Sequence, residues 1–175
     1  LRNIKMGMFP PESATFRNPY YEMIGAMMRG AICGMVAPGN PKLAAKLAWE
    51  DASVSHFNTG VLGEIFNAVM VSLAFVEKDF KQILRMGIDM IPGDSKLYSV
   101  LQYAWEACEK HGNWRDAWLD CDEEFKQYGW IHTYPNAAAE VCALYFADND
   151  YDKLVTNITM SGLDIDSTAN QIACI

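Results

Sequence analysis

Residues 61–77 read VLGEIFNAVMVSLAFVE and contain the longest apolar region of this 175-residue chain. Asn58-Thr59-Gly60 interrupts the chain just before them, so the stretch predicts a helix from Val61 to Glu77 that is buried on most sides. Glu64 and Asn67 break the apolar run, whereas a helix that spans a bilayer needs about 20 mostly apolar residues. We therefore expect a buried core helix here and no membrane span.

The sequence on both sides of this helix also predicts helices. Asn18-Pro19 and Asn40-Pro41 each place an Asn N-cap before a Pro at the first helical position, which is a strong start signal. With residues 61–77, eight helices are expected, and the other seven are 18–35, 41–55, 80–90, 94–110, 112–125, 136–146 and 151–161.

No stretch alternates apolar and polar residues for long enough to predict a strand, so the fold class is all-α. Residues 1–17 contain Pro10-Pro11 and show no periodicity, and we expect them to be irregular. The length suits one domain. The chain starts without Met and ends at Ile175 in an apolar run without a helix stop signal, so we expect residues 1–175 to be one partial domain.

Composition restricts the partners and the compartment. Half of the chain is apolar (51%) and 21% is charged, which indicates a packed interior. A formal charge of −8 argues against nucleic acid as a partner, because binding to its phosphates needs clustered Lys and Arg. The five cysteines form no C-x-x-C pair, and their odd number argues against a disulfide scaffold. A reducing, cytoplasmic compartment is the simplest expectation.

Residues 162–169, GLDIDSTA, carry the clearest signal for chemistry. Asp164 and Asp166 lie two residues apart and Ser167 follows, and such hard oxygen ligands suit Mg²⁺, Mn²⁺ or Ca²⁺. A bound cation would also relieve the repulsion between the two carboxylates. The alternative from the residues alone is that Asp166 or Ser167 caps the last helix. An EF-hand does not fit, because Ala169 stands where that loop needs Gly.

A second group is Gly25-Ala26-Met27-Met28-Arg29 with Gly30 and Gly34. Its small residues would let a ligand come close to the backbone. Close helix packing at the two later glycines is the alternative. His56 lies at a predicted helix end, where it either favours the helix dipole or contacts a ligand. The helical spacing of Trp114 and Trp118 leaves a helical interaction module as a third reading, although such a face is more often core.

Taken in order, these segments resemble the ADP-ribosylglycohydrolase family over nearly all of residues 18–175. The segments that carry the resemblance are Gly25–Arg29, Val36-Ala37-Pro38-Gly39-Asn40-Pro41, Ala44-Ala45, Asp51-Ala52-Ser53-Val54-Ser55-His56, Gly60, Gly63-Glu64, Ile91-Pro92 with Ser95, His132-Thr133 with Pro135-Asn136-Ala137, and Gly162 with Asp164-Ile165-Asp166-Ser167. Each segment alone is a weak signal, whereas the ordered series is specific.

The resemblance implies an orthogonal, all-α helical bundle with a two-Mg²⁺ centre, in which Mn²⁺ is an alternative ion. It implies hydrolysis of the N- or O-glycosidic bond that joins ADP-ribose to a protein side chain or a small molecule. By the same resemblance, the metal ligands are Asp164, Asp166 and Ser167. The residues that contact ADP-ribose would be Gly25, Ala26, Met27, Met28, Arg29 and His56. The alternative is a non-catalytic member that binds ADP-ribose or another nucleotide, or that keeps only the fold.

One part of the family pattern has no match in this sequence. The family's other metal ligands, a Thr followed by paired Asp residues, lie near its N-terminus together with an acidic catalytic residue. Residues 1–17 contain no such cluster, since Glu12-Ser13-Ala14-Thr15 is not followed by two carboxylates. We therefore expect half of a metal site that binds its ion weakly or not at all, and a fragment that is inactive alone. No catalytic residue is assigned.

Overall fold

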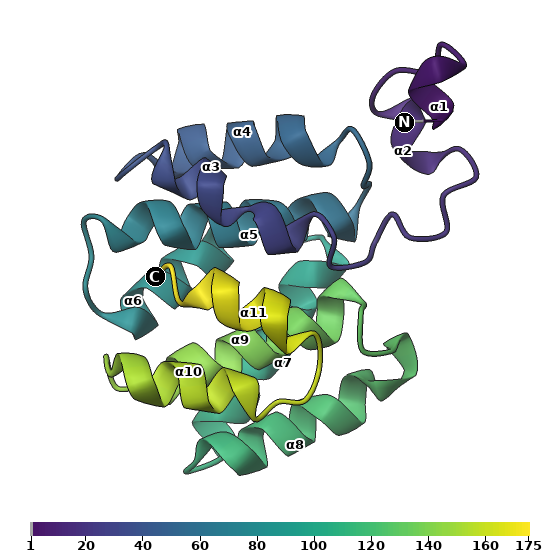
Figure 1. Ribbon diagram of the computed structural model, residues 1–175. Coiled ribbons are helices and arrows are strands. Elements are labelled where there is room, and N and C mark those ends of the chain that lie inside the picture. Colours follow the sequence, from purple (N-terminus) through teal and green to yellow (C-terminus); the bar gives the residue numbers. More distant parts are fainter. Residues whose placement is uncertain (1) are drawn as a thin grey trace.

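The computed structural model describes residues 2–175 and contains only helices and connecting segments, apart from one isolated bridge between Met23 and His132 (Figure 1). The predicted all-α class is confirmed. The elements are α1 (Arg2–Lys5), α2 (Glu12–Thr15), the 3₁₀ turn η1 (Met27–Arg29), α3 (Ala31–Met35), α4 (Pro41–Ala52), α5 (Thr59–Ala74), α6 (Phe80–Asp89), α7 (Lys96–Lys110), α8 (Trp114–Phe125), the 3₁₀ turn η2 (Lys126–Tyr128), α9 (Thr133–Tyr145), α10 (Tyr151–Thr159) and α11 (Ile165–Ile172).

Helix α5, the apolar stretch predicted to be core, lies at the centre of the molecule. It packs against α3 and α4 on one side and against α6, α7, α9 and α11 on the others (Figure 1). Its side chains from Phe66 to Leu73 are all buried. None of the helices described is long and apolar enough to cross a membrane.

Most of the predicted helix starts are confirmed by hydrogen bonds. Asn40, Asp79, Ser95, Asn113 and Asp150 each accept a bond from a backbone N–H in the first turn of the helix that follows. Such a side-chain bond satisfies one of the N–H groups that the helix geometry leaves without a partner. These starts could be predicted because the capping bond is local in sequence.

The predicted helix over residues 18–35 is wrong. Asn18 does accept a bond from the N–H of Tyr20, but the helix does not continue, and regular helical structure begins only at η1 and α3. The intervening backbone bonds to distant segments instead: the Phe57 N–H donates to Tyr21 O over 3.0 Å, and the Ile24 N–H donates to Ile131 O over 2.9 Å. These contacts between segments replace the bonds that a helix would form.

Three further differences concern element ends. Residues 1–17 were expected to be irregular, whereas the described part includes the short helices α1 and α2. Helix α9 begins at Thr133, three residues before the predicted start, because the Nδ1 atom of His132 accepts the Tyr134 N–H over 3.1 Å. The apolar run at the end of the chain has no helix stop signal, so a helix there was expected to continue through Ile175, whereas α11 ends at Ile172.

Gly30 and Gly34 allow close helix packing, which was the alternative to a ligand-binding role for these glycines. A Cβ atom on Gly34 would lie 2.5 Å from Ala68 O and 2.6 Å from the Cβ of Val71, and one on Gly30 would lie 2.7 Å from Glu64 O. The absence of side chains thus lets α3 and the turn before it lie directly on α5. The Trp118 side chain is also buried in the core, which argues against the reading of its face as an interaction surface.

This contact predicts the effect of Gly34→Ala. The added methyl group would overlap the α5 backbone, so we expect a loss of about 1–3 kcal/mol in the free energy of unfolding. Denaturant unfolding followed by circular dichroism measures the loss. Gly93→Ala is the matched control, because nothing lies within 4 Å of a Cβ at Gly93. Equal stability of the two variants would contradict the packing account.

Candidate functional site

The two halves of the site predicted from sequence lie side by side. The turn η1, which holds Met27, Met28 and Arg29, packs against α11, which begins directly after Asp164 (Figure 1). The Ser167 hydroxyl lies 3.6 Å from Met28 Sδ, although the two residues are 139 positions apart in the sequence. Met28 is exposed, whereas Ala26 and Met27 are fully buried and Gly25 is half-buried. The fold therefore brings both groups to one part of the surface.

Backbone hydrogen bonds to two neighbouring segments hold the chain that leads into η1. Tyr21 and Ile24 bond to Phe57 and Ile131, as described above. Thr133, at the start of α9, donates to Glu22 O through its N–H over 3.3 Å and through its hydroxyl over 2.8 Å. The segment is thus fixed between the α4–α5 turn and the start of α9, which positions Gly25.

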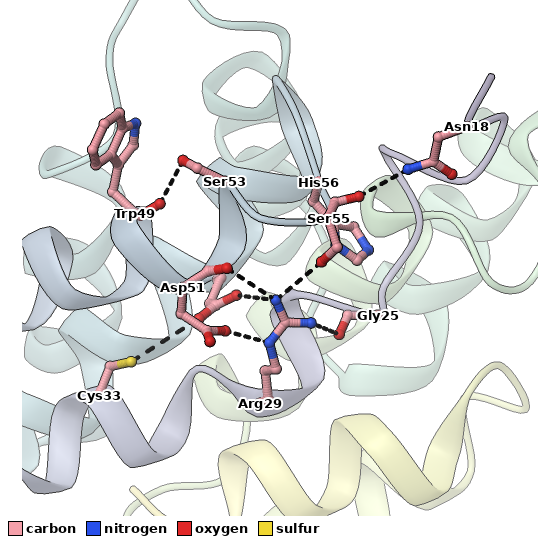
Figure 2. Close-up of polar contacts among 10 residues, drawn as sticks. Asn18, Gly25, Arg29, Cys33, Trp49, Asp51, Ser53, Ser55 and His56 are labelled. Atoms are coloured by element: carbon pink, nitrogen blue, oxygen red, sulfur yellow. Dashed lines mark hydrogen bonds and ion pairs between the residues drawn. The ribbon is translucent and has the colours of Figure 1, made fainter. Parts of the chain in front are cut away.

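The guanidinium of Arg29 joins the Gly25 segment to α4. It pairs with the Asp51 carboxylate through Nε, donates to Gly25 O over 2.8 Å and to Ser55 Oγ over 3.3 Å (Figure 2). Its Nη2 atom also lies 3.6 Å from Glu64 Oε2. Because its donors bond to protein groups, Arg29 holds the Gly25 segment to the end of α4 and to the turn that follows it. The contact of Arg29 with ADP-ribose that the resemblance implies stays a prediction.

The charges around Arg29 shift the acidity of its partners. Burial raises the pKa of Asp51, but the hydrogen bond and the charge of Arg29 outweigh burial and hold that pKa below its ordinary value. Glu64, whose side chain is completely buried, shows the opposite balance. Burial raises the pKa of Glu64 to about 8, and the charge of Arg29 lowers it without overcoming burial. Glu64 is therefore mostly protonated at neutral pH.

His56 lies in the turn after α4, where its side chain contacts Gly25. Ser55 Oγ is 2.9 Å from its Nδ1 atom, and a Cβ built on Gly25 would lie 3.1 Å from its Nε2 atom (Figure 2). Burial, and then the positive charge of Arg29, lower the pKa of His56 to about 4. The ring is therefore neutral at physiological pH. One ring nitrogen bonds to Ser55, and the other faces the Gly25 segment.

Asp164, Asp166 and Ser167 are placed by the start of α11. Asp164 is the N-cap residue, but its side chain accepts no bond from the first turn, and Asp166 and Ser167 lie inside the helix. The capping alternative is thus not observed. Burial and the neighbouring Asp166 carboxyl raise the pKa of Asp164, while Ser167 opposes the shift. The two carboxyl groups are close enough to interact.

A buried polar cluster anchors α11 to the centre of the bundle. Asn67 on α5 donates to the carboxyl of Glu140 on α9 over 3.3 Å and also bonds to the side-chain oxygen of Gln171 on α11. All three side chains are fully buried, and burial raises the pKa of Glu140 well above its ordinary value. These bonds cross three helices, so they tie the C-terminal end of α11, where Gln171 lies, to α5. The N–H of Asp164 is held separately, by Asn136 Oδ1 over 3.3 Å.

The sequence analysis missed the supporting residues Glu140 and Gln171. It noted Glu64 as a break in the apolar run and as part of the resemblance, and Asn67 only as a break in that run. A polar residue inside a buried helix needs a hydrogen-bond partner, so Asn67 in the apolar run already indicated that polar residues elsewhere in the chain would pack against it. Within residues 2–175, no group of three or more His, Cys, Asp or Glu side chains is arranged to hold a metal ion. The start of α11 carries two carboxylates and one hydroxyl, those of Asp164, Asp166 and Ser167.

Replacement of Arg29 by Lys tests its supporting role. Lys keeps the positive charge but lacks the planar set of donors that reaches Asp51, Gly25 and Ser55 together. We expect Arg29→Lys to lower the free energy of unfolding by about 1–3 kcal/mol. Denaturant unfolding is the measurement, with Arg115→Lys as control on an exposed arginine that makes no ion pair in the structure. A loss no larger than that of the control would argue against this role.

The raised pKa of Glu64 predicts a pH effect with a defined sign. Between its ordinary value of 4.5 and about 8, folded Glu64 keeps a proton that the unfolded chain releases. Rising pH in this range therefore favours unfolding. Glu64→Gln mimics the protonated form, so its melting temperature should fall less than that of the wild type between pH 6.5 and 8. The titration of His56 is common to both proteins.

Thermal unfolding at several pH values within this range measures the difference, and Glu140 contributes equally to both proteins. Glu124→Gln, at an exposed carboxylate, should keep the wild-type pH dependence. Parallel pH profiles for the wild type and Glu64→Gln would show that Glu64 ionises normally in the folded protein.

Comparison with known proteins identifies the family of this chain. The model of the ADP-ribosylglycohydrolase family matches residues 1–175, the whole length of the chain. No curated protein and no solved structure matches this chain. The all-α fold and the ordered segments from Gly25 to Ser167 are in keeping with the family match. This chain belongs to the ADP-ribosylglycohydrolase family, which comprises hydrolases that act on ADP-ribosyl compounds.

Proposed function

We propose that this protein is a Mg²⁺-dependent hydrolase that cleaves the N- or O-glycosidic bond of ADP-ribosylated protein side chains or small-molecule ADP-ribose conjugates. The contact between Ser167 and Met28 carries the proposal, because it joins the two groups of residues that the resemblance assigns to metal and to ADP-ribose. A chance match of short motifs would not require these distant segments to meet.

The Gly25–Arg29 segment and His56 form the proposed surface for ADP-ribose. Gly25 lets the neutral His56 ring lie close to its backbone, since any side chain at Gly25 would press on Nε2. A neutral imidazole can donate or accept a hydrogen bond to a ribose hydroxyl or a phosphate oxygen. In this proposal Arg29 positions both segments, and Ala26 and Met27 form the buried base beneath exposed Met28.

The start of α11 fits one hard divalent cation in the type of its ligands. Asp164, Asp166 and Ser167 supply oxygen atoms, and Mg²⁺ commonly uses one or two carboxylates and completes its shell with water and substrate oxygens. The proximity that raises the pKa of Asp164 indicates a carboxyl pair that a cation would favour in its ionised form. A second ion would need further carboxylates, which residues 2–175 do not bring to this cluster.

The chemistry of such a site follows from its charge. When bound, a divalent cation would polarise the ribose hydroxyls and help to orient a water molecule at the anomeric carbon. The residues of this chain would place the ADP-ribose between His56 and α11 and hold α11 through the Asn67–Gln171 bond. No general acid or base is assigned among them.

Metal binding is tested with Asp164→Asn and Asp166→Asn. Mg²⁺ that binds only the folded protein raises its melting temperature, and each substitution removes one of the two charges that hold the ion. We therefore expect a Mg²⁺-dependent rise for the wild type and for the control Asp94→Asn, an exposed carboxylate, and little or none for the two site variants. Equal rises in all four proteins would place the bound ion elsewhere.

The same proteins are then tested with ADP-ribose by calorimetry and with an ADP-ribosylated peptide by chromatography of the released ADP-ribose. Release by the wild type that needs Mg²⁺ and disappears in Asp164→Asn supports hydrolysis. Binding without release supports the non-catalytic alternative. Neither binding nor release would reject hydrolysis and ADP-ribose binding by this chain, and would favour a member that keeps only the fold.

A further inference from the structure

A pocket of about 260 Å³ lies outside the proposed ADP-ribose surface, between the N-terminal segment and the end of α4. Figure 1 shows α1 and α2 beside the loop that follows α4, at the edge of the bundle. The pocket is lined by parts of the N-terminal segment and by Val54 and Ser55. Its volume is slightly below the range of roughly 300–1,000 Å³ for small-molecule sites.

The neutral polar groups of the pocket are engaged within its walls. Asn18 donates to Ala14 O and to Ser55 O over 2.8 Å each, and the Ser13 hydroxyl donates to Val54 O over 3.1 Å. Figure 2 shows the bond from Asn18 to Ser55 on the side of the turn away from Arg29. Asn3 likewise donates to Ser13 O and Phe16 O. These bonds build a defined wall and join it to the α4–α5 turn.

Arg2 and Arg17 supply the charge of the pocket. Both side chains are exposed, and neither forms an ion pair with any residue that the structure describes. No Asp or Glu is among the described residues that line the pocket, although the chain carries a net charge of −8. Arg17 also has a left-handed backbone (φ 52°), and its guanidinium lies 5.5 Å from the centre of the Phe16 ring.

We propose that this pocket binds the phosphate group of a small phosphorylated molecule between Arg2 and Arg17. A guanidinium presents a planar set of donors that matches the oxygens of a phosphate. Two unpaired guanidiniums beside a cavity without carboxylates form the local positive region that such a group needs. Phe16 and Val54 also line the pocket, and they offer apolar surface for the organic part of the ligand.

This inference is independent of the proposed glycosidase activity, because it uses neither the Gly25–Arg29 segment nor α11. The probes are ribose 5-phosphate, inorganic phosphate and unphosphorylated ribose, each titrated into the intact 175-residue chain. Binding is followed by backbone ¹H–¹⁵N NMR and by calorimetry. We expect both phosphates to shift the amides of residues 13–18 and 54–55, with tighter binding of ribose 5-phosphate, and ribose to cause no shift.

The test variant is Arg2→Gln with Arg17→Gln, and the matched control is Lys78→Gln with Arg115→Gln, which removes the same charge from exposed positions elsewhere. Loss of charge-assisted hydrogen bonds should weaken the binding of ribose 5-phosphate by about tenfold or more in the test variant. The control should change it by less than about twofold, since distant exposed charges are screened by salt. Unchanged NMR spectra of both free variants will show that they fold.

Three results would overturn the proposal. The first is the absence of saturable shifts with ribose 5-phosphate at millimolar concentration. The second is an equal loss of affinity in the test and control variants. The third is a set of shifts centred on residues 25–29 and His56, which would assign phosphate binding to the proposed ADP-ribose surface. Failure of hydrolysis with retained phosphate binding would reject the proposed function alone.

Discussion

The burial of α5 on nearly all sides is the constraint on which the rest of this structure depends. The helix presents apolar side chains around its circumference, and removal of that surface from water favours a fold in which other helices cover it. Helices α3 and α4 cover one side, and α6, α7, α9 and α11 cover the others. Gly30 and Gly34 allow the η1–α3 region to approach the α5 backbone directly.

Two polar residues of α5 connect this packing to the candidate site. Glu64 faces Arg29, which bonds to the Gly25 segment and to the turn that carries His56. Asn67 bonds to Gln171 on α11, the helix that carries Asp166 and Ser167. Helix α5 thus contacts both halves of the candidate site, the Gly25–Arg29 segment through Glu64 and α11 through Asn67. Because an unpartnered polar group is costly to bury, these bonds also specify how η1 and α11 lie on α5.

Local signals predicted much of the fold. The all-α class, the central apolar helix and five capping residues follow from patterns that involve neighbours in the sequence. The prediction failed at residues 18–26, where Asn18-Pro19 looked like a helix start. There the backbone of Tyr21 and Ile24 bonds to residues more than 30 positions away, and no local pattern reports such partners. Asn136 was likewise predicted to start a helix, whereas it is buried and holds Asp164.

By itself, the sequence determined the helical class, the core helix and the identity of the residues assigned to the site. Helix periodicity, capping and family motifs each depend on residues that are close together in the sequence. Only the tertiary structure decided that Ser167 meets Met28, that Arg29 points inward to Asp51, Gly25 and Glu64, and that Asn67 joins Gln171. The physical reason is that partners for buried polar groups are chosen by how helices pack. The residues 61–77 that indicated a core helix could not show which neighbours would bond to the side chains of Glu64 and Asn67.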